Sequence, residues 1–128
     1  IIDVIANDNT NLKGMYITQA FAEQVAISTR EGGFTDTAYG LAGLGDFMAT
    51  AMSPNSHNRI YGMHLASRHS GEEEGDEYRP EGYYSLKAIN HRYQGELKQY
   101  PLLSTLYQIV IEQGNVTGLL DTITKCTP

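Results

Sequence analysis

The chain has 128 residues and a mass of 14.2 kDa, the usual size of one domain. Its formal charge of -6 argues against a nucleic-acid-binding surface, because such surfaces take most of their affinity from neutralising phosphates. No apolar run is long enough to suggest a membrane span, and the single cysteine, Cys126, offers no intrachain disulfide. We therefore expect a cytoplasmic protein that binds no nucleic acid and does not insert into a membrane.

The first predicted element is a helix from Asn11 to Arg30, because apolar residues recur there at intervals of three and four. Asn9 or Thr10 can cap its start, and the pair Gly32-Gly33 can end it. The pattern is that of one amphipathic helix with good capping residues.

A second helical segment is predicted to begin with Thr35 or Asp36 as its cap. Its small residues, from Ala38 to Gly45, are poor formers of an isolated helix but allow neighbouring helices to approach closely. This segment therefore needs support from the rest of the fold.

The second half of the chain contains one polar stretch and then three predicted helices. Five carboxylates between His69 and Pro80 are typical of a solvated loop. The predicted helices are Tyr83 to Gln94, Leu102 to Gln113 with Pro101 at the first helical position, and Val116 to Lys125. No segment alternates convincingly between apolar and polar residues, so we expect an all-α domain.

Metal binding is not expected. His64 and His69 are five residues apart and do not share one helical face, and no thiol cluster accompanies them.

One motif is specific enough to carry a family resemblance. Gly43-Leu44-Gly45-Asp46, then Thr50, Ser56-His57-Asn58-Arg59 and Gly62 resemble the signature of the C-terminal domain of NAD-dependent glycerol-3-phosphate dehydrogenase. The helix from Asn11 to Phe21, the Pro80-Glu81-Gly82 turn and the Tyr100-Pro101-Leu102 segment are similar to the family in the same order. The resemblance thus covers nearly the whole chain.

The resemblance implies a multi-helical domain related to the C-terminal domain of 6-phosphogluconate dehydrogenase, spanning residues 1–128. It would complete a substrate cleft beside an N-terminal Rossmann domain, which this chain lacks; a start at Ile1 without Met fits a piece of a longer protein. The implied reaction is reversible hydride transfer between NAD(P)H and dihydroxyacetone phosphate, giving sn-glycerol 3-phosphate for phospholipid synthesis. The choice between NAD and NADP belongs to the Rossmann domain, and a homodimer is compatible with the family.

The same resemblance assigns roles to individual residues. Asp46 would orient the hydroxyl end of the substrate and the catalytic lysine, and Thr50 would donate a hydrogen bond to the substrate. Ser56 and Asn58 would donate to substrate oxygens, with Asn58 at the phosphate, and Glu81 would meet the cofactor. The residues alone leave simpler alternatives open: a buried helix carboxylate for Asp46, and turn capping for Ser56 and Asn58 after Pro54-Asn55.

Two departures from the family matter. The family usually has Arg where this chain has His57, and that Arg reaches phosphate and cofactor; either His57 protonates when phosphate binds, or Arg59 takes over. The general-acid lysine of the family, in a Lys-Asn pair, would lie upstream of Ile1, and Lys13 is out of register with it. We therefore expect no catalytic residue in this chain, and no activity from it alone.

Two other functions remain open at this stage. The chain could be an acidic helical module that binds a protein partner, or a domain of a dehydrogenase acting on another 2-hydroxy acid or sugar phosphate. An interaction module would expose a contiguous apolar patch, whereas a substrate domain would gather Asp46, Thr50, Ser56 and Asn58 around one pocket.

Overall fold

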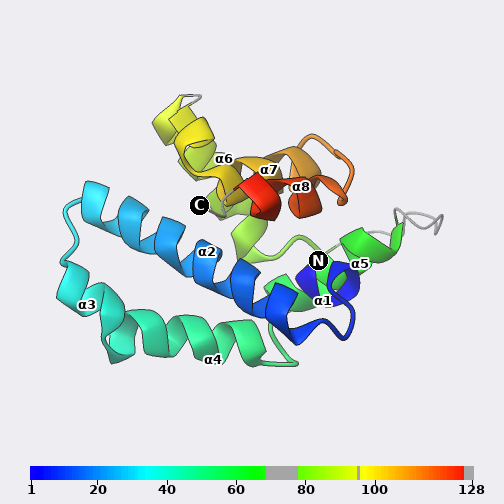
Figure 1. The fold of residues 1–128 in the computed structure, drawn as a ribbon. Helices are drawn as coiled ribbons and strands as arrows, with labels where there is room; N and C mark the ends of the chain where they lie inside the picture. The colour runs from blue at the N-terminus through cyan, green and yellow to red at the C-terminus, as the bar shows by residue number, and fades with distance from the viewer. Residues whose placement is uncertain (69–77, 95, 126–128) are drawn as a thin grey trace.

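The computed structural model describes residues 1–68, 78–94 and 96–125 (Figure 1). Its elements are α1 (Ile2–Ile5), α2 (Thr10–Arg30), α3 (Thr35–Tyr39), the π-helical turn η1 (Leu41–Gly45), α4 (Asp46–Met52), α5 (His57–Arg68), α6 (Glu81–Tyr93), the 3-10 turn η2 (Glu96–Gln99), α7 (Pro101–Val110) and α8 (Gly118–Lys125). No strand occurs among these residues, which confirms the all-α prediction. None of the helices in these three ranges has the length and apolar content needed to cross a bilayer.

The helix predicted from Asn11 to Arg30 is confirmed as α2, which is the central element of the fold (Figure 1). The Asn9 side chain caps it by accepting a hydrogen bond from the Leu12 N–H at 3.0 Å. Figure 1 shows α3 and α4 returning along one side of α2, with α7 and α8 on the other side. On the first side, the Phe21 ring contacts the rings of Tyr39 and Phe47, both at 5.4 Å between centroids. Helix α2 therefore contacts both halves of the molecule.

The main core lies where α2, α7 and α8 meet. It consists of buried side chains of Tyr16, Leu102, Ile109, Val116, Leu119 and Ile123. A smaller cluster, Tyr93, Leu97 and Tyr100, joins α6 to η2 and the start of α7. The apolar side chains that recur along α7 and α8 thus face inward, which is the arrangement that buries most apolar area.

The small residues from Ala38 to Gly45 lie at the end of α3 and in η1, which leads into α4. A Cβ added at Gly43 would lie 2.0 Å from the Ala38 carbonyl oxygen, so only glycine allows this close approach. The predicted cap was wrong by a residue: Phe34 is the extended residue before α3, and no side chain caps the helix. Thr35 already has helical backbone, so its hydroxyl is not at the capping position.

Two helices near the C-terminus were also predicted to extend too far: the first ends before Gln113, and the second begins after Val116. Helix α7 ends at Val110 because the chain reverses through Gln113, whose φ is 58°, and the Gly114 N–H bonds back to the Gln108 carbonyl at 2.9 Å. Helix α8 begins at Gly118 because Asn115 Oδ1 accepts from the Thr117 N–H at 2.9 Å and holds a turn instead. Residues 69–77 of the predicted acidic loop, and Cys126, lie outside the described residues.

The ends of α2 and α6 are joined by a carboxylate that should make stability pH-dependent. Glu31 accepts hydrogen bonds from Arg92, through Nε at 2.9 Å and through a second guanidinium nitrogen, and from the Tyr93 hydroxyl at 2.7 Å. These bonds lower the pKa of Glu31 from its ordinary 4.5 to about 2. A depressed carboxyl pKa stabilises the fold above the unfolded-state value, and this contribution is lost as pH falls from about 4.5 towards 2.

We therefore expect Glu31→Gln to lower the melting temperature at pH 7, with the difference from wild type closing as pH approaches 2. Melting both proteins by circular dichroism at several pH values measures this. A difference that stays constant from pH 7 to pH 2.5 would contradict the assignment. Because the pair is exposed, high salt should shrink the difference at pH 7.

Candidate functional site

An open pocket of about 530 Å³ lies where the end of α4 and the beginnings of α5 and α6 meet. It is lined by Ala49, Thr50, Ser53, Asn55, Ser56, His57, Asn58, Tyr78 and Glu81. Most of these side chains carry a hydroxyl, amide, imidazole or carboxylate group. The pocket is therefore suited to a small polar ligand rather than to an apolar one.

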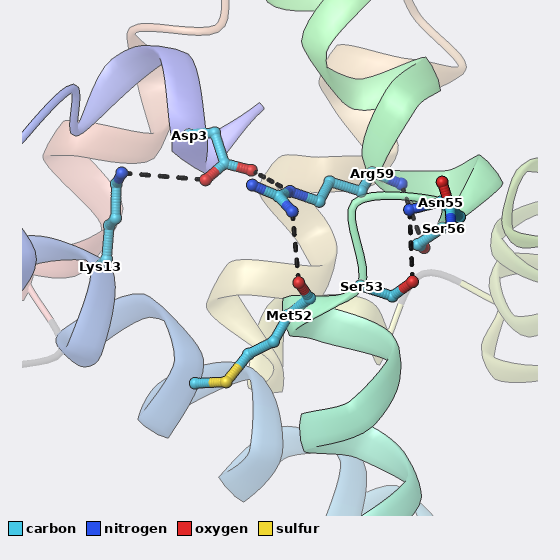
Figure 2. Close-up of polar contacts among 7 residues, drawn as sticks. All are labelled: Asp3, Lys13, Met52, Ser53, Asn55, Ser56 and Arg59. Atoms are coloured by element: carbon cyan, nitrogen blue, oxygen red, sulfur yellow. Dashed lines mark hydrogen bonds and ion pairs between the residues drawn. The ribbon is translucent and has the colours of Figure 1, made fainter.

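The loop between α4 and α5 is held by its own serines. Ser53 Oγ accepts from the Asn55 N–H at 3.2 Å, and the Ser56 N–H donates to the Ser53 carbonyl at 3.3 Å. Ser56 Oγ accepts from the Arg59 N–H at 3.4 Å, which caps the first turn of α5 (Figure 2). The turn expected after Pro54-Asn55 therefore ends at Ser56, which is the cap, and Asn58 lies in the helix that begins at His57. Serine is a preferred cap residue, so Ser56 is the signal that could have found this helix, and the Gly62 in its interior weakens that signal.

The start of α5 brings a feature that sequence reasoning missed. The first N–H groups of a helix lack partners within it, and the helix dipole places partial positive charge there. The side chains of His57 and Asn58, the first two residues of α5, line the pocket. An anion in this pocket would meet the N-terminal end of a 12-residue helix.

Asn58 ties the start of α5 to the start of α6. Its Oδ1 accepts from the Gly82 N–H at 3.1 Å, so the orientation of the amide is set by its donor and the amide nitrogen is the group left to donate to a ligand. A Cβ at Gly82 would lie 2.6 Å from Asn58 Oδ1. A larger residue at position 82 would therefore force the Asn58 amide to shift.

Tyr78 is a second pocket residue that the sequence did not single out. Its hydroxyl is 3.4 Å from His57 Nδ1, and the two rings meet edge to face with centroids 5.5 Å apart. The contact leaves Nε2 as the second polar atom of the imidazole. A single tyrosine at the end of an acidic stretch carries no sequence signal for this role.

The predicted site residues separate into two groups. The pocket described above is lined by Thr50, Ser56, His57, Asn58 and Glu81. Asp46 and Arg59 are not among its lining residues. Asp46 is exposed at the start of α4, four residues before Thr50, so the alternative of a buried helix carboxylate was wrong. The capping alternative holds for Ser56, and Asn58 Oδ1 likewise bonds a backbone N–H.

Arg59 makes contacts outside the pocket. Its Nε donates to Asp3 Oδ2 at 2.7 Å, and a terminal guanidinium nitrogen donates to the Met52 carbonyl at 3.3 Å (Figure 2). The Arg59 guanidinium lowers the pKa of Asp3, mainly through this hydrogen bond. Lys13 Nζ lies 3.8 Å from the other oxygen of Asp3. Arg59, the last residue of the Ser56-His57-Asn58-Arg59 motif, is therefore engaged by a carboxylate of α1.

No cluster of three or more His, Cys, Asp or Glu side chains that could hold a metal ion occurs in the described ranges. Among the lining residues, His57 is the one basic side chain and Glu81 the one acidic side chain. The groups that this pocket offers an anion are thus mostly neutral hydrogen-bond donors and a helix terminus.

Comparison with known proteins identifies the family of the chain. The family model described as "NAD-dependent glycerol-3-phosphate dehydrogenase C-terminus" matches residues 1–121. A protein of Pseudomonas putida named glycerol-3-phosphate dehydrogenase [NAD(P)+] is 32% identical over 120 residues, covering 92% of this chain and 35% of the relative. A Staphylococcus epidermidis protein of the same name is 30% identical over 115 residues, 88% of this chain and 35% of that protein. No solved structure matches the chain.

The fold and pocket define a helical domain with a polar pocket at a helix N-terminus. The chain belongs to the NAD-dependent glycerol-3-phosphate dehydrogenase C-terminal family. It spans about a third of the length of the curated relatives that it matches. The relation to the C-terminal domain of 6-phosphogluconate dehydrogenase stays a prediction.

Proposed function

We propose that this chain is the substrate-binding domain of an NAD(P)-dependent glycerol-3-phosphate dehydrogenase. The whole enzyme would interconvert dihydroxyacetone phosphate and sn-glycerol 3-phosphate. The observation that carries this proposal is that one pocket at the start of α5 is lined by Ser56 and Asn58, which match the family motif, and by His57, which replaces its usual Arg. An interaction module would not need such a pocket, so this arrangement supports the substrate domain over that alternative.

The phosphate group of the substrate is proposed to bind at the start of α5. The Ser56 hydroxyl and the Asn58 amide nitrogen donate to phosphate oxygens, and the first N–H groups of the helix add partial positive charge. His57 donates in place of the family's usual Arg and carries a positive charge when protonated. Glu81, also in the lining, works against an anion, so the phosphate sits on the α5 side of the pocket.

The reacting end of the substrate is proposed to lie towards α4. Thr50 lines the pocket one helical turn after Asp46, so the two side chains follow the same face of α4. Thr50 hydrogen-bonds the substrate, while Asp46 orients its hydroxyl end and the general-acid lysine that the rest of the protein would supply. The proton for the developing alkoxide then comes from outside this chain.

The cofactor would contact this chain only at the edge of the pocket. Bound NAD(P)H supplies the hydride that reduces the substrate carbonyl. The Glu81 carboxylate is exposed in the lining, where it can accept hydrogen bonds from ribose hydroxyls. His57 lies beside the same opening and is the second proposed cofactor contact. A Rossmann domain preceding this chain would bind the remainder of the cofactor.

The proposal is tested by titrating the ¹⁵N-labelled chain with sn-glycerol 3-phosphate and following its amide signals by NMR. We expect saturable shifts at the His57 and Asn58 amides with a dissociation constant of roughly 1 mM, or about -4 kcal/mol. Glycerol is the matched control without phosphate and should leave these signals unmoved. Equal shifts with glycerol, or unmoved pocket amides, would contradict the assignment.

The same preparation should not oxidise NADH with dihydroxyacetone phosphate, because the proposed general acid and most of the cofactor site lie outside the chain. Following NADH absorbance with the pure chain measures this. Turnover that copurifies with the chain through two chromatographic steps would overturn the prediction.

A further inference from the structure

Arg59 joins three elements around the pocket loop. From the first turn of α5, its guanidinium donates to Asp3 of α1 at 2.7 Å and to the carbonyl of Met52, the last residue of α4, at 3.3 Å. Figure 2 shows the guanidinium between these two acceptors, with the loop of residues 53–56 beside it. We call the contacts of Arg59 with Asp3 and Met52 the Arg59 clamp.

The clamp fixes both ends of the pocket loop. The Met52 carbonyl is at the C-terminal end of α4, where helix carbonyls lack partners and a cation is favourable. The backbone N–H of the same Arg59 bonds to Ser56 Oγ at the other end of the loop. One residue thus sets the distance between the end of α4 and the cap of α5.

The N-terminal segment that carries Asp3 packs against α5. A Cβ at Gly62 of α5 would lie 2.6 Å from the nitrogen of Ile1, the residue before α1. Asp3 and Arg59 are each about 30% exposed, and Lys13 contacts the second Asp3 oxygen. The bond between them lowers the pKa of Asp3 and raises that of Arg59, so both groups stay charged and paired over the physiological range.

We infer that Arg59 is a positioning residue, which holds Ser56, His57 and Asn58 towards the pocket through its clamp, and not the phosphate ligand that replaces the family's usual Arg. The identity of the ligand rests on the proposed function. The positioning role rests on the contacts of Arg59, which point to α1 and α4 rather than into the pocket lining.

Asp3→Asn separates the two roles because they predict opposite changes in affinity. If Arg59 positions the loop, loss of the Asp3 charge loosens it, and we expect about fivefold weaker binding of sn-glycerol 3-phosphate in the NMR titration. If Arg59 is a phosphate ligand, the same change releases its guanidinium and removes a negative charge, so binding tightens. Unchanged or tighter binding overturns the inference.

Two matched variants complete the titration. Asp8→Asn removes the same charge at an exposed residue outside the clamp and the pocket, and it should bind at least as well as wild type. Asp3→Glu keeps the carboxylate and should restore most of the affinity that Asp3→Asn loses. Weakening of the same size in Asp8→Asn, or no recovery in Asp3→Glu, counts against a specific clamp.

Hydrogen exchange tests the clamp without any ligand. In Asp3→Asn the Ser56 and Arg59 amides, which close the loop, should exchange faster, while the Ile109 amide in the core helix α7 should not change. Unchanged exchange at Ser56 and Arg59 overturns the inference. If the wild-type chain binds no sn-glycerol 3-phosphate, the proposed function fails, and the exchange result alone decides whether Arg59 positions the loop.

Discussion

Glu23→Ala should destabilise the domain by about 3 kcal/mol, because it leaves the first turn of α7 without an acceptor. The buried Glu23 carboxylate, on α2, accepts from the N–H groups of Leu102 and Leu103, both at 2.8 Å. Pro101 has no N–H, and the next amide, of Ser104, bonds to the Tyr100 carbonyl at 2.8 Å. One carboxylate thus supplies both missing partners, and its charge suits the positive end of the helix.

Glu23→Gln refines this prediction. Glutamine keeps the volume and one acceptor oxygen, but its NH₂ group would face the second N–H, so we expect a loss of about 1.5 kcal/mol. Urea unfolding followed by circular dichroism gives the free energy of unfolding, and melting temperature should fall by roughly 10 °C for Glu23→Ala. Glu112→Ala, an exposed carboxylate beyond the end of α7, should change stability by less than about 0.5 kcal/mol. Similar losses at both positions would show that general charge, not the capping of α7, is responsible.

Asn58→Asp should weaken binding of sn-glycerol 3-phosphate by about 30- to 100-fold, or roughly 2 to 3 kcal/mol. The substitution keeps an oxygen for the Gly82 N–H, so the link between α5 and α6 survives. It replaces the amide donor proposed to meet phosphate with a negative charge. The expected loss therefore comes from the ligand contact rather than from the fold.

The NMR titration described for the wild-type chain measures this effect, with the melting temperature as a check on folding. Asn11→Asp, on an exposed residue of α2 away from the pocket, adds the same charge and should leave affinity within about twofold of wild type. Binding by Asn58→Asp that matches the Asn11→Asp control would remove Asn58 from the proposed phosphate site.

Much of the helical content was predictable because it depends on local patterns. The periodicity of α2, its Asn9 cap and the proline at the start of α7 are properties of neighbouring residues. Helix α5 was missed because its apolar residues are interrupted by polar ones that face the pocket and α1, and Ser56 was interpreted as a turn residue. The family motif located the candidate pocket. The place of Tyr78 in that pocket could not be predicted, because its contact is with His57, 21 residues away in the sequence.

The sequence by itself determined an all-α domain, the existence of helix α2 and the family, since periodicity, caps and motif spacing are all encoded within short segments. Only the tertiary structure decided how the polar residues are paired. Asp3 lies 56 residues from Arg59, and Glu23 lies 79 residues from Leu102. Such pairs depend on which helices pack together, and the packing is set by burial of the shared apolar core and not by any local signal.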